Sequence, residues 1–550
     1  MRFCIGKDVL PHEYKGAIYN RESAARLRFI SKVFVIVCLV FAARTLQLGL
    51  QQSETKRYVG SINKVERRAD IVDRNGVVLA KSIISGHIQF FPARVQDKEV
   101  DAVAKIVHEI APADYSIKDA LNLIQNKKSW RYIKKNASEE QIAMVKPYNC
   151  FEVEAVAVRR YPQRNVFSHI VGFAGKDGGS EGIEKLYDEY LRENKDPLVL
   201  SVDSRVQNIF HEQLSKAVDK FHAKGAMGML MKSSTGEMIA MVQLPDFNPH
   251  NGGNVPQSIR TFKLLRDNFE MGSVFKIFNT ALAYENGLEN RVYDIDKPYM
   301  VYDKFNRPAL KKPISDVSSF IRDVNKGKIK RRMTAPEIML HSCNVGSAKI
   351  ARDLPEGAQK EFFHKLHLDK SLDLDFGKTE RAITYKNWGP TEKATAAFGQ
   401  GISVTPMHLL LAVNAVTNGG IYLYPTILKR GHGAVRGERV LSPEISAKLR
   451  EIMYGVVEET SGKKAKVEGL EIGGKTGTAE KRTSVGTADK NRNMTVFMGV
   501  FPIKTPQYII LVMLDEPQGI PETGGWKTSA WNAVPTAGAI LNGISSLLFE

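Results

Sequence analysis

The spacing of apolar and polar residues predicts regular strands and helices over the C-terminal part of the chain. Residues 225–245 form two apolar runs around a Ser-Thr-Gly-Glu turn, which predicts a β-hairpin. The runs "MTVFMGVFP" and "YIILVMLDE" predict a second hairpin that turns around 503–507. Apolar helices are expected at 273–286, about 405–417 and about 534–548. Strands, then helices, then strands predict an α+β fold with an antiparallel sheet.

The preceding region has a less regular pattern. Residues 51–197 mix short β-like runs, such as "ADIVDRNGVVLA" at 69–80, with a charged, helix-like stretch at about 101–146. The polar segment "RENKDP" at 192–197 is a suitable domain boundary. We therefore expect a β-rich domain over 51–197 and a second domain over 198–550.

An apolar segment near the N-terminus predicts a membrane anchor. Its unbroken apolar run is Val33–Ala43. The charged side chains of Lys32 and Arg44, near the ends of this run, can extend toward the two membrane–water interfaces. As a helix, residues 29–50 rise about 33 Å, enough to cross the hydrocarbon core. Excess positive charge in 1–28 predicts a cytoplasmic tail and places the remaining chain outside. The alternative is a cleaved signal peptide, but the polar leader is long for one.

Composition narrows the class of protein. The chain has 550 residues, more than one ordinary core accommodates, with a globular 43% hydrophobic and 25% charged residues. A formal net charge of +18 suits an anionic membrane surface or wall polymer as well as nucleic acid. The basic clusters at 127–135 and 326–332 lack an aromatic RNA-binding signature, so we expect no nucleic-acid partner. The four cysteines show no metal-ligand spacing, so we expect no metal site.

Three short polar motifs follow one another in the second domain. They are Ser273-Val-Phe-Lys276, Ser342-Cys-Asn344 and Lys475-Thr476-Gly477-Thr478. Each motif alone occurs often by chance, but the ordered set S-x-x-K, S-x-N and K-T-G is typical of penicillin-binding proteins and serine β-lactamases. The set predicts an acyl-transfer site that uses a serine nucleophile.

The first motif suggests how the serine is activated. On a helix, positions 273 and 276 share one face a turn apart. Burial among apolar residues favours the neutral amine of Lys276, which can then accept the proton of Ser273. The helix N-terminus offers N–H groups to a developing oxyanion. The simpler alternative is that Ser273 caps the helix and Lys276 extends to the surface.

The other two motifs supply supporting groups. Ser342 can relay a proton to the leaving group, and Asn344 can orient the lysine and hold a substrate amide. The alternative for this motif, a cap before an amphipathic helix, is compatible with both roles. Lys475 adds positive charge, and the hydroxyls of Thr476 and Thr478 can bind a carboxylate. The stretch "LEIGGKTGTAEKR" at 470–482 predicts a strand, and its glycines, among them Gly477, would let substrate backbone approach closely.

Two further motif matches point to other functions. Residues 469–476 fit a phosphate-binding loop, but the strand and helix that such a loop needs are not predicted around them. Residues 178–182 fit the G-x-S-x-G elbow of hydrolases, but they lie in a polar stretch better interpreted as a turn and helix start. We expect neither function.

From residue 29 onward, the sequence resembles the class B penicillin-binding proteins, most closely the cell-division type. The resemblance is carried by "RRADIVDRNGVVLA", "FEMGSVFK", "HSCNVGSAKIA" and "GGKTGTAEK", in the family's order. It implies a penicillin-binding/β-lactamase-like transpeptidase domain after an elongated, β-rich pedestal. It also implies a peptidoglycan D,D-transpeptidase, in which Ser273 acylates on a donor stem peptide ending in D-Ala-D-Ala. An acceptor amine of another stem peptide then resolves the acyl-enzyme.

The resemblance also implies partners and a location. β-Lactams would acylate the same serine, and no cofactor is needed. A multi-span glycosyltransferase and other division proteins would act beside the chain at the septum, in the inner (cytoplasmic) membrane, with the catalytic domain outside. A membrane-anchored β-lactamase or sensor, a D,D-carboxypeptidase and a division scaffold with a vestigial site are the alternatives.

Overall fold

The computed structural model describes residues 21–51, 67–127, 129–175, 177–316, 327, 330–431, 435–482 and 488–549. Side chains are not described for 21–28, 30–31, 47–51, 482, 488 and 490–491. Most of the predicted cytoplasmic tail and part of the basic cluster at 326–332 therefore lie outside the described residues. The chain divides into two compact units, one of 1–66 with 84–158 and the other of 67–83 with 159–550.

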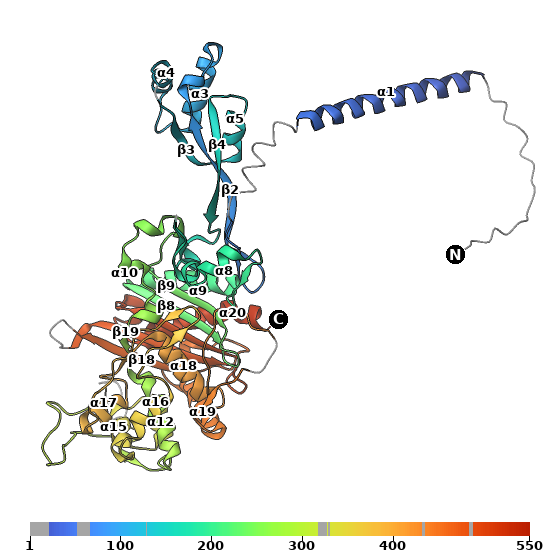
Figure 1. The fold of residues 1–550 in the computed structure, drawn as a ribbon. Coiled ribbons are helices and arrows are strands. Elements are labelled where there is room, and N and C mark those ends of the chain that lie inside the picture. Colours follow the sequence, from blue (N-terminus) through green and yellow to red (C-terminus); the bar gives the residue numbers. More distant parts are fainter. Residues whose placement is uncertain are drawn as a thin grey trace, which may run out of the picture. The chain divides into compact units, whose positions relative to one another are not determined.

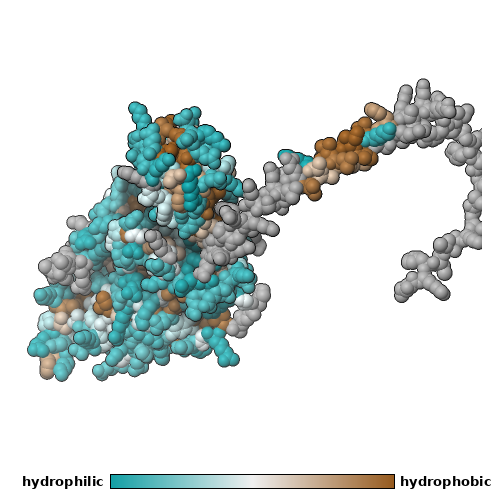
Figure 2. Space-filling model, turned by 45° about the horizontal axis from the view of Figure 1, so that its top comes forward, coloured by the Kyte–Doolittle hydropathy of each residue, from teal (hydrophilic) through white to brown (hydrophobic). Residues whose placement is uncertain are grey.

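Helix α1 (Arg21–Gln51) covers the segment predicted as an anchor. Its described large apolar side chains, among them Phe34, Leu39 and Phe41, are exposed. Figure 2 shows a brown, hydrophobic band along this helix. Over the part of the chain that the structure describes, no helix combines the length and apolar character needed to cross a membrane.

The first unit also contains a small sheet covered by helices. The later part of β2 (Val78–Phe90) pairs antiparallel with β3 (Arg131–Ala137), and β4 (Phe151–Arg160) also pairs with β2. Three helices share a buried core with these strands: α3 (Val100–Ile110), α4 (Ile117–Gln125) and α5 (Glu139–Val145). Helices α4 and α5 each begin with a capping box, which satisfies N–H groups at the helix start.

The helix-like prediction for 101–146 is wrong for residues 131–137, which form β3. Ile133 and Ala137 are buried there, while the basic residues between them point outward or are half-buried. The charged composition matches a helix surface, but pairing with β2 decides the structure. The described part of 51–197 contains helix and strand in similar amounts, so the expectation of a β-rich domain is only half right.

The second unit is built on a five-stranded antiparallel sheet (Figure 1). Its strand order is β18-β19-β20-β8-β9, so β18 is an edge strand. Both predicted hairpins are confirmed as neighbouring pairs in this sheet. The strands are β8 (Gly225–Lys232), β9 (Met238–Leu244), β18 (Gly473–Arg482), β19 (Ala488–Phe501) and β20 (Tyr508–Asp515).

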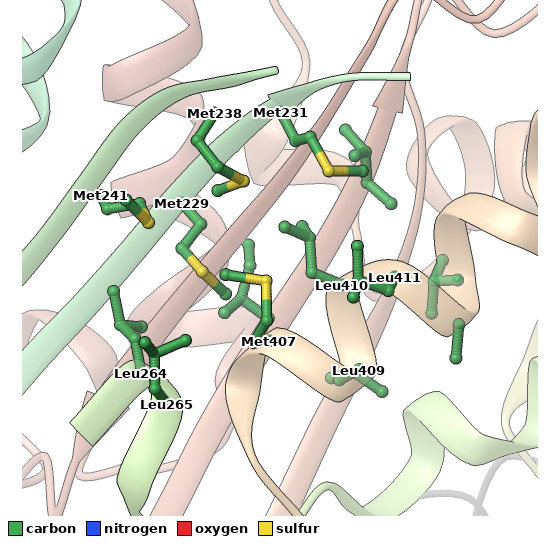
Figure 3. Packing of buried hydrophobic residues seen from close by; sticks show 14 of the residues in the cluster. Met229, Met231, Met238, Met241, Leu264, Leu265, Met407, Leu409, Leu410 and Leu411 are labelled. Atoms are coloured by element: carbon green, nitrogen blue, oxygen red, sulfur yellow. The ribbon is translucent and has the colours of Figure 1, made fainter. Parts of the chain in front are cut away.

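Helices cover both faces of this sheet. On one face, α9 (Ser204–Phe221) and α20 (Ala533–Leu548) share a buried core with the strands. On the other face, the core includes α18 (Pro406–Thr417), and methionines of β8 and β9 pack against Met407 and its neighbouring leucines (Figure 3). The predicted helices at 405–417 and 534–548 are thereby confirmed. Flexible methionines fill the irregular space between a twisted sheet and a helix.

A group of helices beside the sheet carries the first two motifs. The helices are α12 (Lys276–Glu285), α14 (Ala335–His341), α15 (Asn344–Asp353), α16 (Ala358–Lys365), α17 (Pro390–Ala396) and α19 (Pro443–Glu459). Apolar residues of α12, α14, α15 and α17 share a separate buried cluster. This packing fixes the two motifs relative to each other.

A buried carboxylate joins distant segments of the second unit. Glu184 in α7 (Gly182–Leu186) has no exposed surface and accepts from the Nε atoms of Arg159, at 2.6 Å, and Arg68, at 3.0 Å. Arg68 also pairs with Asp188 at 2.6 Å. Two guanidinium groups therefore depend on one buried anion.

We expect Glu184→Gln to lower the free energy of unfolding of this unit by about 3 kcal/mol, because it leaves the largely buried Arg159 without its anion and removes one of the two carboxylates that pair with Arg68. Urea unfolding followed by fluorescence measures the loss. The matched control is Glu212→Gln, which breaks an exposed pair with Lys216 and should cost less than about 1 kcal/mol. Equal losses for the two variants would contradict a structural role for the buried pair.

Candidate active site

The first motif lies where a short 3₁₀ turn leads into a helix. Residues Gly272–Phe275 form the 3₁₀ turn, and the α-helix begins at Lys276 rather than at the predicted 273. In a 3₁₀ turn, side chains three positions apart lie directly above one another. The Nζ of Lys276 is accordingly 2.6 Å from the Oγ of Ser273.

The amine of Lys276 is buried. Only 1% of the residue is exposed, so the alternative of a lysine that extends to the surface is wrong. Burial lowers the pKa of Lys276 to about 8, although the negative charge of Asp316 acts in the opposite direction. A substantial fraction of the amine is therefore neutral near physiological pH and able to accept a proton. Ser273 itself is partly exposed and accessible to a substrate.

The second motif contacts this amine from another element. Ser342 ends α14 with a left-handed backbone (φ 60°), and Cys343 is the N-cap of α15. This sharp change of direction places the Oδ1 of Asn344 2.7 Å from the Nζ of Lys276. The Oγ of Ser342 lies 3.4 Å from the same nitrogen. The amine thus faces three polar side chains.

The third motif reaches the same group from the sheet. Lys475 on β18 is fully buried, and its Nζ is 2.9 Å from the Oγ of Ser342. Burial, and then the nearby charge of Lys276, lower the pKa of Lys475 well below its ordinary value. One hydroxyl therefore connects two buried amines, and protons can pass between them through Ser342.

The two threonines of the third motif lie on the opposite side of β18 from Lys475. The Oγ1 of Thr476 is 2.9 Å from the Oγ of Ser461, and that of Thr478 accepts from the N–H of Ser529 at 3.1 Å. Thr476 is buried and Thr478 is half-exposed. Each hydroxyl keeps further hydrogen-bonding capacity. Sequence reasoning did not find Ser461 and Ser529, because no motif marks them.

Packing within the protein accounts for the glycines of this strand. A Cβ at Gly477 would lie 2.4 Å from the carbonyl oxygen of Met271. Gly272 has a φ of +54°, and a Cβ there would lie 2.7 Å from the carbonyl oxygen of Thr478. These contacts bring β18 against the turn that carries Ser273. Contact with Met271 is therefore a sufficient reason for a glycine at 477, and the expected approach of substrate to this residue stays a prediction.

Neither of the other two motif matches has the structure that its function would need. The helix start expected at the second match is confirmed, but a short strand lies where the turn was expected. Residues 469–476 run into β18, a strand, and no helix follows that could hold a phosphate. Residues 178–182 lie at β6 (Gly179–Glu181) and the start of α7. Among the described residues, no group of three His, Cys, Asp or Glu side chains is placed to hold a metal ion.

Comparisons with known proteins agree with this architecture. Residues 226–535 match the penicillin binding protein transpeptidase domain, and residues 64–219 match the penicillin-binding protein dimerisation domain. The probable peptidoglycan D,D-transpeptidase FtsI of Caulobacter vibrioides is 30% identical over 498 residues, which cover 88% of this chain and 81% of that protein. The chain belongs to the class B penicillin-binding proteins of the FtsI type.

More distant relatives extend the comparison. The peptidoglycan D,D-transpeptidase FtsI of Escherichia coli K12 is 27% identical over 516 residues, covering 87% of this chain and 83% of its own. The crystal structure of penicillin binding protein 2X from Streptococcus thermophilus has a TM-score of 0.72 at 19% identity, over 88% of this chain and 80% of that one. The expected transpeptidase fold with a preceding dimerisation domain is thereby confirmed.

Proposed function

We propose that this class B penicillin-binding protein is a peptidoglycan D,D-transpeptidase that forms an acyl-enzyme on Ser273. The observation that carries the proposal is the buried amine of Lys276, 2.6 Å from the Ser273 hydroxyl and 2.7 Å from the Asn344 amide oxygen. This geometry makes the lysine a base for the partly exposed serine. The names of the FtsI relatives support the same reaction.

Acylation follows from these contacts. The neutral amine of Lys276 accepts the Ser273 proton while the serine Oγ attacks the carbonyl carbon of the penultimate D-alanine. N–H groups at the start of the turn and helix stabilise the oxyanion. The C–N bond then breaks, and Ser342, in contact with both lysines, passes a proton to the leaving nitrogen of the terminal D-alanine. An ester on Ser273 remains.

Deacylation cross-links the wall. An amine of a second stem peptide attacks the ester carbon, a new amide bond forms, and the serine Oγ regains its proton. The amine loses a proton, which Lys276 can take because its neutral form is regenerated in each cycle. A cofactor has no step to perform in this sequence.

Strand β18 is the proposed surface for the donor peptide. It is the edge strand of the sheet, and an edge strand can pair with an added extended chain. Thr476, Gly477 and Thr478 on this strand would bind the terminal carboxylate, whose arrival would favour the protonated form of Lys475. Asn344 would hold a substrate amide in addition to orienting Lys276.

β-Lactams would react at the same serine. Their strained amide presents a carbonyl beside a carboxylate, as the D-Ala-D-Ala end does, so the same groups bind and acylate. After the ring opens, its leaving nitrogen stays covalently attached to the acyl group and cannot diffuse away as free D-alanine does. The acyl-enzyme therefore persists. A β-lactamase would instead release the hydrolysed drug rapidly.

The proposal extends to the placement of the chain. Residues 1–28 would be a cytoplasmic tail, 29–50 a single membrane anchor, 51–197 the pedestal and 198–550 the catalytic domain outside the inner membrane. The continuous helix α1 with exposed apolar side chains supports an anchor. A cross-linking enzyme needs newly polymerised strands, so we propose a multi-span glycosyltransferase of the division machinery as its partner at the septum.

Ser273→Ala should abolish the covalent adduct with a fluorescent penicillin, because the nucleophile is lost. The protein should still fold, since removal of a half-exposed hydroxyl costs about 1 kcal/mol. Gel fluorescence and intact-mass measurements test this, with Ser258→Ala at an exposed position as the control that keeps the adduct. An adduct located on any other serine overturns the assignment. Rapid release of hydrolysed drug from the wild type indicates a lactamase.

Lys276→Arg should slow acylation severely, because arginine stays protonated and cannot act as the base. In the wild type, the acylation rate should rise with pH and level off above about 8, since the active form is the neutral amine. Stopped-flow measurement of the penicillin reaction from pH 6 to 10 tests both points. Near-normal acylation by the arginine variant would show that the lysine is not a proton acceptor.

Exchange of 29–50 for an unrelated single-span helix of the same orientation should weaken co-purification with the glycosyltransferase and impair division. Small residues such as Cys38, Ala42 and Ala43 allow another helix to approach closely. A milder variant replaces only these three by leucine, which keeps the apolar span. If division and co-purification are unchanged in both variants, the segment is a passive tether.

A further inference from the structure

A carboxylate outside the three motifs binds the start of the second one. Asp316 follows an arm whose two ends are joined by a backbone bridge between Tyr299 and Ile314. Its Oδ1 accepts from the N–H of Asn344 at 2.5 Å, and its Oδ2 accepts from the N–H of Val345 at 3.5 Å. Oδ2 also accepts from the thiol of Cys343 at 3.1 Å.

The two backbone donors, the N–H groups of Asn344 and Val345, belong to the first turn of a helix. The first N–H groups of α15 have no partners within the helix, and its N-terminus carries partial positive charge. The side chain of the N-cap residue, Cys343, accepts from the N–H of Gly346, at 3.2 Å. The carboxylate of Asp316 accepts from the N–H groups of Asn344 and Val345 and places a negative charge at the positive end of the helix.

The same contacts determine which way Asn344 faces. Its backbone N–H is held by Asp316, and its Nδ2 points toward the carbonyl oxygen of Ser315 at 3.5 Å. The amide oxygen is therefore directed to the Nζ of Lys276, at 2.7 Å. Residues 315 and 316 together hold the asparagine from the side opposite the lysine.

Charge links Asp316 to the lysine as well. The titratable groups that face Lys276 are Lys475 from β18, Cys343 from the start of α15, and Asp316. Burial keeps the Cys343 thiol protonated by raising its pKa, so Asp316 is the anion of the set. Its charge raises the pKa of Lys276 against the larger effect of burial.

We propose that Asp316 is a positioning residue of the active site, which fixes the first turn of α15, directs the Asn344 oxygen to the Lys276 amine and adds negative charge beside that amine. The inference rests on the proposed function, because it assigns Lys276 the role of base. It gives Asp316, which lies between the first two motifs in the sequence, a function in catalysis. This residue supplies a negative charge that the second motif, Ser342-Cys343-Asn344, does not contain.

The test is the pH dependence of penicillin acylation in Asp316→Asn. The amide keeps one acceptor oxygen of the same size for the N–H of Asn344 and removes the charge, while its NH2 group replaces the second acceptor, which faces Val345 and Cys343. The rising limb of the acylation rate should shift to lower pH by about 0.5–1 unit, because loss of the anion lowers the pKa of Lys276. The shift is smaller than the 1–3 units typical of directly paired charges, because Lys276 and Asp316 are connected through Asn344 and do not pair directly. The plateau rate should also fall, since the asparagine is held less firmly.

Asp296→Asn in the full-length protein is the matched control. It removes the same charge from an exposed aspartate, and its limb and plateau should coincide with those of the wild type. Thermal unfolding of all three proteins identifies a merely structural effect, which would lower the melting temperature and the plateau without shifting the limb.

A limb for Asp316→Asn that coincides with the wild-type limb would overturn the proposal, whatever the plateau. Asp316→Ala, which also removes the acceptor, should lower the plateau further than the asparagine variant, and an unchanged plateau in both would overturn it too. Failure of the proposed function has a different result: the wild-type protein would then form no adduct on Ser273 at any pH.

Discussion

The active site depends on the cost of burying one amine. An ammonium group in an apolar interior loses its hydration, and it either becomes neutral or must find acceptors. Lys276 does both in part: burial favours the neutral form, while Ser273, Ser342 and Asn344 surround the nitrogen. The helices beside the sheet must therefore exclude water from one side of this amine and leave the serine on the other side accessible. Their tight apolar packing is a requirement of the chemistry as well as of stability.

The edge position of β18 meets a second requirement. A strand inside the sheet would have both backbone edges paired, whereas β18 has a partner strand along one edge only. Glycine at 272 and 477 allows that turn and strand to lie against each other without intervening side chains. The nucleophile and the proposed carboxylate-binding strand are thus neighbours because of backbone packing. A larger residue at either position would separate them.

Sequence patterns predicted the site better than its surroundings. Spacing alone placed Ser273 and Lys276 on one face, and apolar neighbours predicted that the lysine is buried; both hold in the structure. The meeting of Ser342, Asn344 and Lys475 required knowledge of such motif sets, because no local rule brings residues so distant in sequence together. Strand β3 was missed because its exposed charges resemble those of a helix, and only pairing with β2 identifies it. Asp316, Ser461 and Ser529 were missed because their partners are backbone groups or single hydroxyls.

The two lysines give the proposed reaction a further property. Two amines that share the Ser342 hydroxyl cannot both remain charged at low cost, so their titrations are coupled. A substrate carboxylate arriving near Lys475 would favour the protonated form of that lysine. The positive charge at Lys475 would in turn disfavour a second charge at Lys276 and increase its neutral fraction. Binding of the donor carboxylate would then prepare the base for its step, and a ligand without a carboxylate would bind to a site in which Lys276 is more often protonated and inactive.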